Sequence, residues 1–162
     1  MESIFYRELI MTTYTEENKH LIKVFVDEVI NKKNLLALRD FLDPSFEGNF
    51  ENIVTFSGIN QTYMLLQMLF DKVPDFKIRI ENCTAENDKV TAQIDICQGF
   101  LFDKNGSENT SLHTFRIEWG KLVQYCGNQS LLIPNEILRI LKDKKNLKNL
   151  IQPYGYPTIP LE

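Results

Sequence analysis

The sequence contains few residues that could hold a metal ion or build a covalent framework. It has only two histidines, and its three cysteines (Cys83, Cys97 and Cys126) are irregularly spaced and form no Cys-x-x-Cys pair. Structural zinc sites need closely spaced cysteine and histidine ligands, and disulfide frameworks need paired cysteines. We therefore expect no metal and no disulfide. Reduced thiols in turn predict a cytoplasmic protein.

Long apolar runs and an excess of basic charge are also missing. No apolar run approaches the roughly 20 residues that cross a bilayer, so we expect no membrane segment. The net charge of −4 comes from mixed signs, which predicts no nucleic-acid partner. The seven glycines are dispersed rather than gathered in a phosphate-binding loop, and we expect no cofactor.

The first half of the chain has the spacing of amphipathic helices. Thr15 followed by two glutamates is typical of a helix start, and apolar residues then recur at helical spacing as far as Ile30. Asn34 begins a second, short helix. A third helix is predicted from Ser57, and Pro74 ends it.

The second half alternates between apolar and polar residues, as half-buried strands do. Such strands are predicted over 76–81, 90–97, 112–118 and 121–126, with Trp119-Gly120 as the last tight turn. Helices followed by a meander predict an α+β fold, with the helices on one face of an antiparallel sheet. We expect an N-terminal extension over 1–14, one domain over 15–128, and a C-terminal helix with a proline-rich tail over 129–162.

Three segments, in this order, resemble the SnoaL-like domain of the nuclear transport factor 2-like superfamily over about residues 15–128. They are Glu16-Glu-Asn-Lys with Asn34-Leu-Leu-Ala-Leu, then Phe70-Asp-Lys-Val-Pro-Asp-Phe76, then Ala85-Glu-Asn-Asp-Lys-Val90 with Phe115-Arg-Ile-Glu-Trp-Gly-Lys-Leu-Val123. The resemblance implies a cone-shaped domain in which a curved sheet and the helices enclose an apolar pocket. Members include polyketide cyclases, isomerases and dehydratases that move protons, and also proteins that bind ligands without chemistry.

The residues that carry the family's chemistry are replaced here. In SnoaL-like cyclases an Asp on the last strand acts as the acid and base, and Gly127 stands at the matching position. A histidine of the family that follows the first short helix corresponds to Asn49. The resemblance therefore implies the pocket without its usual catalytic groups.

The register of the last hairpin predicts which side chains face that pocket. If Trp119-Gly120 is a two-residue loop, His113 lies opposite Cys126 and Phe115 lies opposite Gln124, all on one face. This is the more apolar face, so we expect it to look toward the helices. A single β-bulge would reverse the facing.

Two residues are candidates for acid–base chemistry. His113 has the suitable unperturbed pKa of about 6.5, although a strand histidine can also be purely structural. Asp95 is the only carboxylate in the middle of a long strand, but it alternates onto the polar side, which is typical of a solvated or dimer-forming face. The two residues share a face only if one strand contains a bulge.

The expected ligand-binding residues come from both the helices and the strands. They are Phe25, Phe46, Tyr63, Phe115, Gln124 and Cys126. Phe25 and Tyr63, together with Tyr125, are the candidates for stacking on a flat ligand. Cys126 is also a candidate nucleophile, against the simpler interpretation of a small buried side chain.

Three functions remain open from the sequence. The first is a domain that binds a small apolar or aromatic molecule. The second is a cofactor-free cyclase or isomerase that uses His113. The third is a non-catalytic homodimer that pairs through the open face of the sheet, with Thr91, Gln93, Asp95, Thr114, Arg116 and Val123 as the candidate contacts.

Overall fold

The computed structural model describes residues 2–50, 54–98 and 110–127. Three helical segments precede most of the sheet: α1 (Glu2–Phe25) with its continuation η1 (Val26–Asn31), the short η2 (Leu35–Ala37) with α2 (Leu38–Phe41), and α3 (Gly58–Lys72). The strands are β1 (Leu42–Phe50), β2 (Val54–Ser57), β3 (Lys77–Glu86), β4 (Lys89–Gln98), β5 (Thr110–Glu118) and β6 (Lys121–Gly127). The α+β class predicted from the sequence is confirmed.

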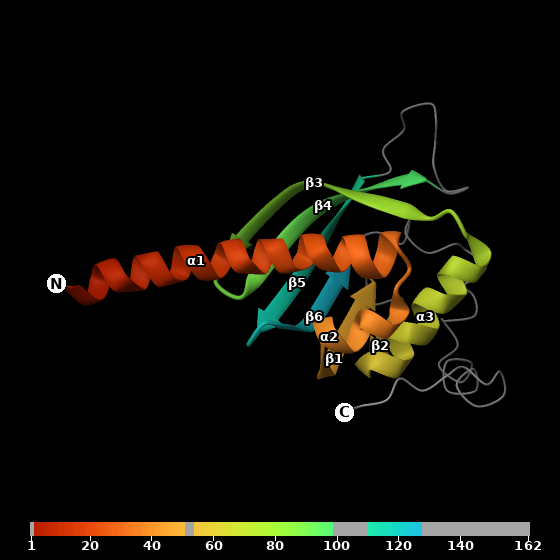
Figure 1. Ribbon diagram of the computed structural model, residues 1–162, viewed down its shortest axis with the longest axis horizontal. Coiled ribbons are helices and arrows are strands. Elements are labelled where there is room, and N and C mark those ends of the chain that lie inside the picture. Colours follow the sequence, from red (N-terminus) through yellow and green to blue (C-terminus); the bar gives the residue numbers. More distant parts are fainter. Residues whose placement is uncertain (1, 51–53, 99–109, 128–162) are drawn as a thin grey trace.

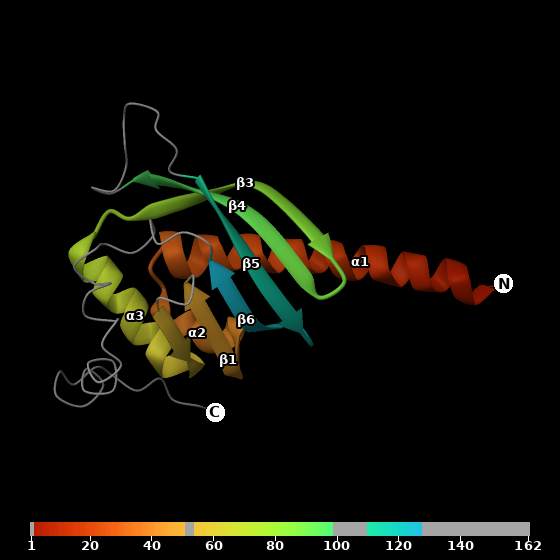
Figure 2. The same ribbon diagram turned by 180° about the vertical axis from the view of Figure 1, so that it is seen from behind.

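The six strands form one curved sheet in the order β2-β1-β6-β5-β4-β3. β1 pairs with β6 in parallel and the remaining neighbours are antiparallel, so the sheet is mixed rather than wholly antiparallel. The last part of α1 lies across the inner face of the sheet, and α3 lies beside β1 and β2 (Figure 1). The opposite view shows the outer face with no described helix over it (Figure 2).

The first helix is longer than its sequence signals predict. Thr15 was expected to begin it, but α1 begins at Glu2, so Thr15 lies inside the helix. The first turns of α1 extend beyond the sheet in both views (Figures 1 and 2). No helix of the described residues is long and apolar enough to cross a membrane.

The end of the first helical segment is fixed to the sheet by side chains. α1 passes into η1, a π-helical turn. Asn31 then closes two hydrogen bonds with Ile78 of β3: Nδ2 donates to the carbonyl at 3.0 Å, and Oδ1 accepts from the amide at 2.9 Å. Lys33 Nζ donates to the carbonyl of Phe76 at 2.9 Å. These bonds hold the helix end against the start of β3.

The third helix begins where Ser57 predicts it. Ser57 precedes α3 in extended conformation, and its amide donates to Oε1 of Gln61 at 2.8 Å. The side chain of Ser57 makes no cap bond. The predicted C-terminal helix, with the proline-rich tail, lies outside the described residues.

Candidate functional site

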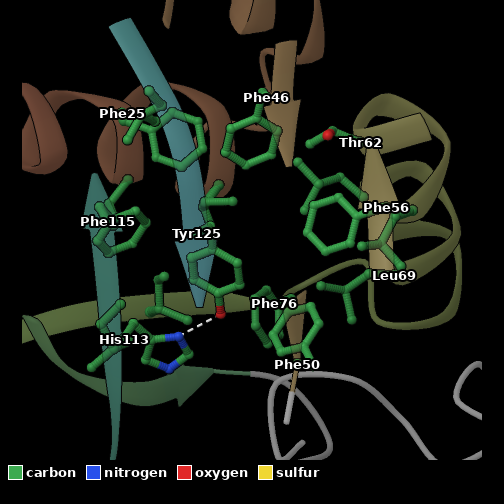
Figure 3. A pocket seen from close by; sticks show the side chains of 17 residues that line it. Phe25, Phe46, Phe50, Phe56, Thr62, Leu69, Phe76, His113, Phe115 and Tyr125 are labelled. Atoms are coloured by element: carbon green, nitrogen blue, oxygen red, sulfur yellow. Dashed lines mark hydrogen bonds between the residues drawn. The ribbon is translucent and has the colours of Figure 1, made fainter. Parts of the chain in front are cut away.

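A cavity of about 90 Å³ lies between the helices and the inner face of the sheet. Its wall is almost entirely apolar, and aromatic rings make up much of it (Figure 3). The aromatic members are Phe25, Phe46, Phe50, Phe56, Phe76, Phe115 and Tyr125. Thr62 and His113 are the other lining residues with polar side-chain atoms. The cavity is therefore suited to an apolar molecule with few polar atoms.

The helical side of the cavity is supplied by the π-helical turn and by α3. Phe25, Val26 and Ile30 line the cavity across the junction of α1 and η1. π-Helical turns inside α-helices are frequent at functional sites because they change which side chains face inward. Phe25 is held by an edge-on contact with Phe41, with ring centroids 5.6 Å apart.

The sheet side is built from rows of residues that lie opposite one another on adjacent strands. One row runs from Phe56 through Gly48 and Tyr125 to Phe115. A Cβ atom on Gly48 would overlap the Phe56 ring, so only glycine leaves room for that ring. The small residue thus allows large aromatic side chains to lie over β1.

The neighbouring row contains the histidine. Phe50 lies opposite Gly127, Gly127 opposite His113, and His113 opposite Ala92. Gly127 and Ala92 are both small, and His113 between them is 0% exposed. His113 therefore lies deep in the inner face, as its alternation with Phe115 predicts.

Hydrogen bonds link three side chains in this row and the row beside it. Nε2 of His113 is 2.6 Å from Oγ of Ser111, and Nδ1 is 2.5 Å from the hydroxyl of Tyr125 (Figure 3). Ser111 is 3% exposed and Tyr125 is 9% exposed. Both nitrogens of the imidazole are thus engaged by hydroxyl groups.

Burial determines the protonation states of His113 and Tyr125. It lowers the pKa of His113 from 6.5 to about 4, because the imidazolium loses its hydration in the apolar wall. It also raises the pKa of Tyr125 well above 10.0. At neutral pH His113 is therefore a neutral imidazole and Tyr125 a neutral phenol.

The Tyr125 phenol occupies space that a side chain at position 127 would need. A Cβ atom on Gly127 would lie 2.5 Å from the Tyr125 oxygen and 3.0 Å from Cδ1 of Phe50. Real Cβ atoms do not approach other atoms so closely, so an aspartate here would require Tyr125 to move. The Tyr125 hydroxyl, where it now lies, and the side chain of an aspartate at position 127 would overlap.

The predicted register of the last hairpin holds next to the turn and is wrong from Arg116 back toward the start of β5. Ile117 pairs with Leu122 as expected, but a bulge at Val123 shifts the next pairs, so that Phe115 lies opposite Tyr125 and His113 opposite Gly127. Gln124 and Cys126 consequently face outward and are exposed. They do not line the cavity, and Tyr125 takes the place expected for Gln124.

Asp95 lies on the outer face of the sheet, away from His113. Its carboxylate is 3.4 Å from the guanidinium of Arg79 on β3. Its neighbours Ile94 and Ile96 are buried on the inner face. The structure therefore does not bring the two candidate catalytic residues together.

The remaining predicted site residues lie where expected, with one exception. Phe25, Phe46, Phe115 and His113 line the cavity, while Tyr63 is half-buried and packs against the core outside the lining. Their roles in binding or catalysis stay predictions. Thr62 Oγ1, also in the wall, donates to the carbonyl of Gly58 at 2.8 Å.

Several lining residues were not identified from the sequence. Phe50 and Phe56 lie on β1 and β2, which pair with each other as antiparallel strands. Ser111 bonds to His113 without lining the cavity, and its signal in the sequence was that it alternates in step with His113 and Phe115 along β5. No group of three or more metal-ligating side chains occurs within residues 14–50, 54–98 and 110–127. Cys83, Cys97 and Cys126 are free thiols.

The sequence model of the SnoaL-like polyketide cyclases matches residues 20–126. The chain belongs to this family. No curated protein sequence matches it. Among solved structures, an epoxide hydrolase of the LEH-like type from M. tuberculosis is similar at 14% identity and a TM-score of 0.58, covering 86% of this chain and 98% of that one.

Two further solved structures are similar to this chain. A protein from Jannaschia sp. CCS1 assigned as a SnoaL-like polyketide cyclase has 20% identity and a TM-score of 0.59, over 80% of this chain and 94% of its own. A de novo designed protein with a curved β-sheet has 18% identity and a TM-score of 0.55, over 83% and 97%. Identities this low show the nuclear transport factor 2-like fold alone, and a designed protein shares it, so the site must decide the function.

Proposed function

We propose that this protein binds a small apolar molecule in the cavity between η1, α3 and the sheet, without transferring a proton to or from it. One observation carries the proposal: among the described lining residues there is no carboxylate, and the histidine is held between two hydroxyl groups. Apolar walls with a few placed polar groups are typical of small-molecule sites.

The protonation states argue against the family's proton-transfer chemistry. Proton abstraction next to a carbonyl needs a base whose pKa lies near the working pH. With its pKa lowered to about 4, His113 is a weak base. The position of the family's aspartate holds Gly127, and the Tyr125 hydroxyl blocks the space beside it.

The volume favours a compact ligand. An engineered apolar cavity of about 150 Å³ holds benzene, and the cavity here measures about 90 Å³. A system of several fused rings exceeds this space. The expected occupant is therefore a small molecule, or the small apolar end of a larger one.

Titration with small hydrocarbons, followed by NMR, tests the proposal. Leu66 lines the cavity on α3, and Leu66→Phe adds a ring to that space. Leu21→Phe is the matched control, because Leu21 is also half-buried against the core but lies outside the lining. We expect cyclopentane or benzene to bind the wild type and Leu21→Phe with similar affinity, and Leu66→Phe at least about tenfold more weakly. Failure of every probe to bind the wild type, or equal binding by both variants, would contradict the proposal.

A further inference from the structure

Helix α3 lacks the exposed side that a helix packed against a sheet normally has. From Gly58 to Phe70 every residue of α3 is buried or half-buried, and exposure begins at Asp71 and Lys72 in its last turn. The part of α1 over residues 14–25 shows the ordinary pattern, with the exposed residues Glu16, Glu17, His20 and Lys23. A helix that is buried all round is covered on more than one side.

Two methionines mark the second covered side of α3. Met64 is 1% exposed, and Met68, one turn later, is 8% exposed. Met64 lies two positions from Thr62 and two positions from Leu66, and both of these residues line the cavity. Two positions correspond to a rotation of about 200° on an α-helix, so Met64 lies on the side away from the cavity. The cover of Met64 is therefore distinct from the walls of the cavity.

The described elements lie on the other sides of α3. Those that contact it most are β1, β2, η2 and α2. In both views α3 forms one edge of the described molecule, and no described helix or strand lies beyond it (Figures 1 and 2). The structure holds a single chain, so the cover of Met64 comes from this chain. It is to be sought outside residues 2–50, 54–98 and 110–127.

The C-terminal segment 128–162 has the length and the starting point to provide this cover. It follows Gly127, which pairs with Phe50 of β1, the strand that lies against α3. Residues 128–134, when extended, span up to about 23 Å, whereas two strand spacings and the width of one helix add to about 20 Å. The segment 99–109 instead joins β4 and β5, which β6 and β1 separate from β2 at the edge of the sheet.

The sequence of the C-terminal segment also fits an apolar surface. It predicts a helix over about residues 135–150, in which Ile137 and Leu141 are four positions apart and share one side. Arg139 is two positions from each of them and is predicted on the opposite side. Methionine side chains are flexible and fit irregular apolar neighbours, so the two methionines of α3 suit such a helix.

We propose that the C-terminal segment docks on α3 through an apolar helix side that contains Ile137 and Leu141, and that it covers Met64 and Met68. The helix α3 then has the cavity on one side and this segment on the other. The docking surface is separate from the cavity, so the inference does not depend on whether a ligand binds there.

Methyl NMR on the full chain tests this placement. In protein with 13C-labelled methionine, leucine and isoleucine methyl groups, nuclear Overhauser effects should connect the Met64 methyl to Ile137 or Leu141. Effects that connect Met64 only to β1, β2, η2 and α2 would overturn the proposal. Mixing labelled with unlabelled protein separates contacts within one chain from contacts between two copies. Contacts found only between copies would also overturn it.

Oxidation by hydrogen peroxide gives an independent measurement with a matched pair of variants. Leu141→Gln changes the predicted docking side, and Arg139→Gln places the same residue on the opposite side. We expect Leu141→Gln to speed the oxidation of Met64 at least about fivefold, because the thioether becomes accessible, and Arg139→Gln to change it less than about twofold. Equal rates in the two variants would contradict the proposal. Unchanged amide exchange in β4 and β5 would show that the exposure of Met64 is local, and the NMR contacts of the wild type decide the case if Leu141→Gln unfolds the domain.

Discussion

The two faces of the sheet hold groups of polar side chains under opposite conditions, the inner group on β5 and β6 and the outer group on β3 and β4. On the inner face, Ser111, His113 and Tyr125 are buried and linked at 2.6 and 2.5 Å. On the outer face, Arg79 is 2.6 Å from Glu81 and 3.4 Å from Asp95, but its side chain is 63% exposed. The two groups have similar distances, but water reaches the outer group and not the inner one.

Burial, rather than distance, therefore decides how much each of these interactions contributes to stability. An exposed ion pair contributes about 0–1 kcal/mol, because water solvates both charges when the pair separates. A buried group that loses its partner costs about 1–3 kcal/mol, because no water replaces that partner. The same substitution should accordingly have a larger effect on the inner face than on the outer face.

Placing a carboxylate on the inner face should produce the largest effect. Gly127→Asp puts a charge against the Tyr125 oxygen and the Phe50 ring. We expect the free energy of unfolding to fall by at least about 3 kcal/mol at pH 7, since an unpaired charge is buried. Urea unfolding monitored by circular dichroism measures the change.

Gly127→Asn is the matched control for this charge. It has the same size and makes the same overlap without ionising. The difference between the two variants should shrink as the pH falls toward 5, because burial raises the pKa of the aspartate and its neutral form becomes populated. Equal stability of the two variants at pH 7 would contradict the argument.

The next largest effect is the acid sensitivity caused by His113. Its pKa is about 4 in the folded protein against 6.5 for the free side chain, so the unfolded chain takes up the proton first as the pH falls. The stabilisation by the neutral ring is complete above about pH 6.5 and is lost between pH 6.5 and 4. The gap between the two pKa values corresponds to about 3 kcal/mol.

Unfolding free energies across this pH range check the linkage. The wild-type curve should be steeper than that of His113→Gln between pH 6.5 and 4, and both should flatten above pH 7. His20→Gln, which changes the exposed histidine of α1, should follow the wild type. Parallel curves for the wild type and His113→Gln would show that His113 does not titrate with folding.

A smaller effect is expected at Gly48. Gly48→Ala brings a methyl group into the Phe56 ring, and overpacking of this kind costs about 1–3 kcal/mol. Phe56→Leu makes room, so the double variant should be more stable than the sum of the two single changes predicts. Additive changes in unfolding free energy would argue against the overlap.

The smallest effect belongs to the outer face. Arg79→Ala removes the pairs with Glu81 and Asp95, and we expect the smallest loss of stability among these variants, because water solvates both charges; the loss should diminish further in high salt. A loss as large as that of the buried variants would remove the distinction between the two faces. Unfolding in 0.1 M and 1 M salt provides the comparison.

Local periodicity was sufficient to predict the α+β class and the inward-facing residues of the central strands, but not the parallel pairing of β1 with β6. The alternation in β4 and β5 places Ile94, His113 and Phe115 on the inner face, and the structure has them there. The α3 start at Gly58 follows Ser57 as predicted. These features depend on neighbours in the sequence, so they can be deduced from one chain.

The bulge at Val123 could not be deduced in the same way. It places Tyr125 between Phe115 of the same hairpin and Gly48 of β1, and β1 is far away in the sequence. A sign of it exists in the sequence: Leu122 and Val123 are consecutive apolar residues, and both are buried. Such a break in alternation is where a register deduced from turn length should be doubted.

The dimer through the outer face stays a prediction. The exposed and half-buried residues proposed for it, among them Thr91, Gln93 and Thr114, do lie on that face, together with Asp95. Analytical ultracentrifugation at micromolar concentration would decide the oligomeric state.

The parallel pairing of β1 with β6 has a consequence for how the cavity comes into being. Leu42 pairs with Leu122, and Gly48 with Tyr125, so the two strands close a loop of most of the domain. Pairings this distant in sequence form slowly because a long loop must be ordered first. During synthesis, the helices and β1 leave the ribosome long before their partner strand. Pulsed hydrogen exchange should find β1 and β6 protected together and late, which would make the binding cavity the final product of folding.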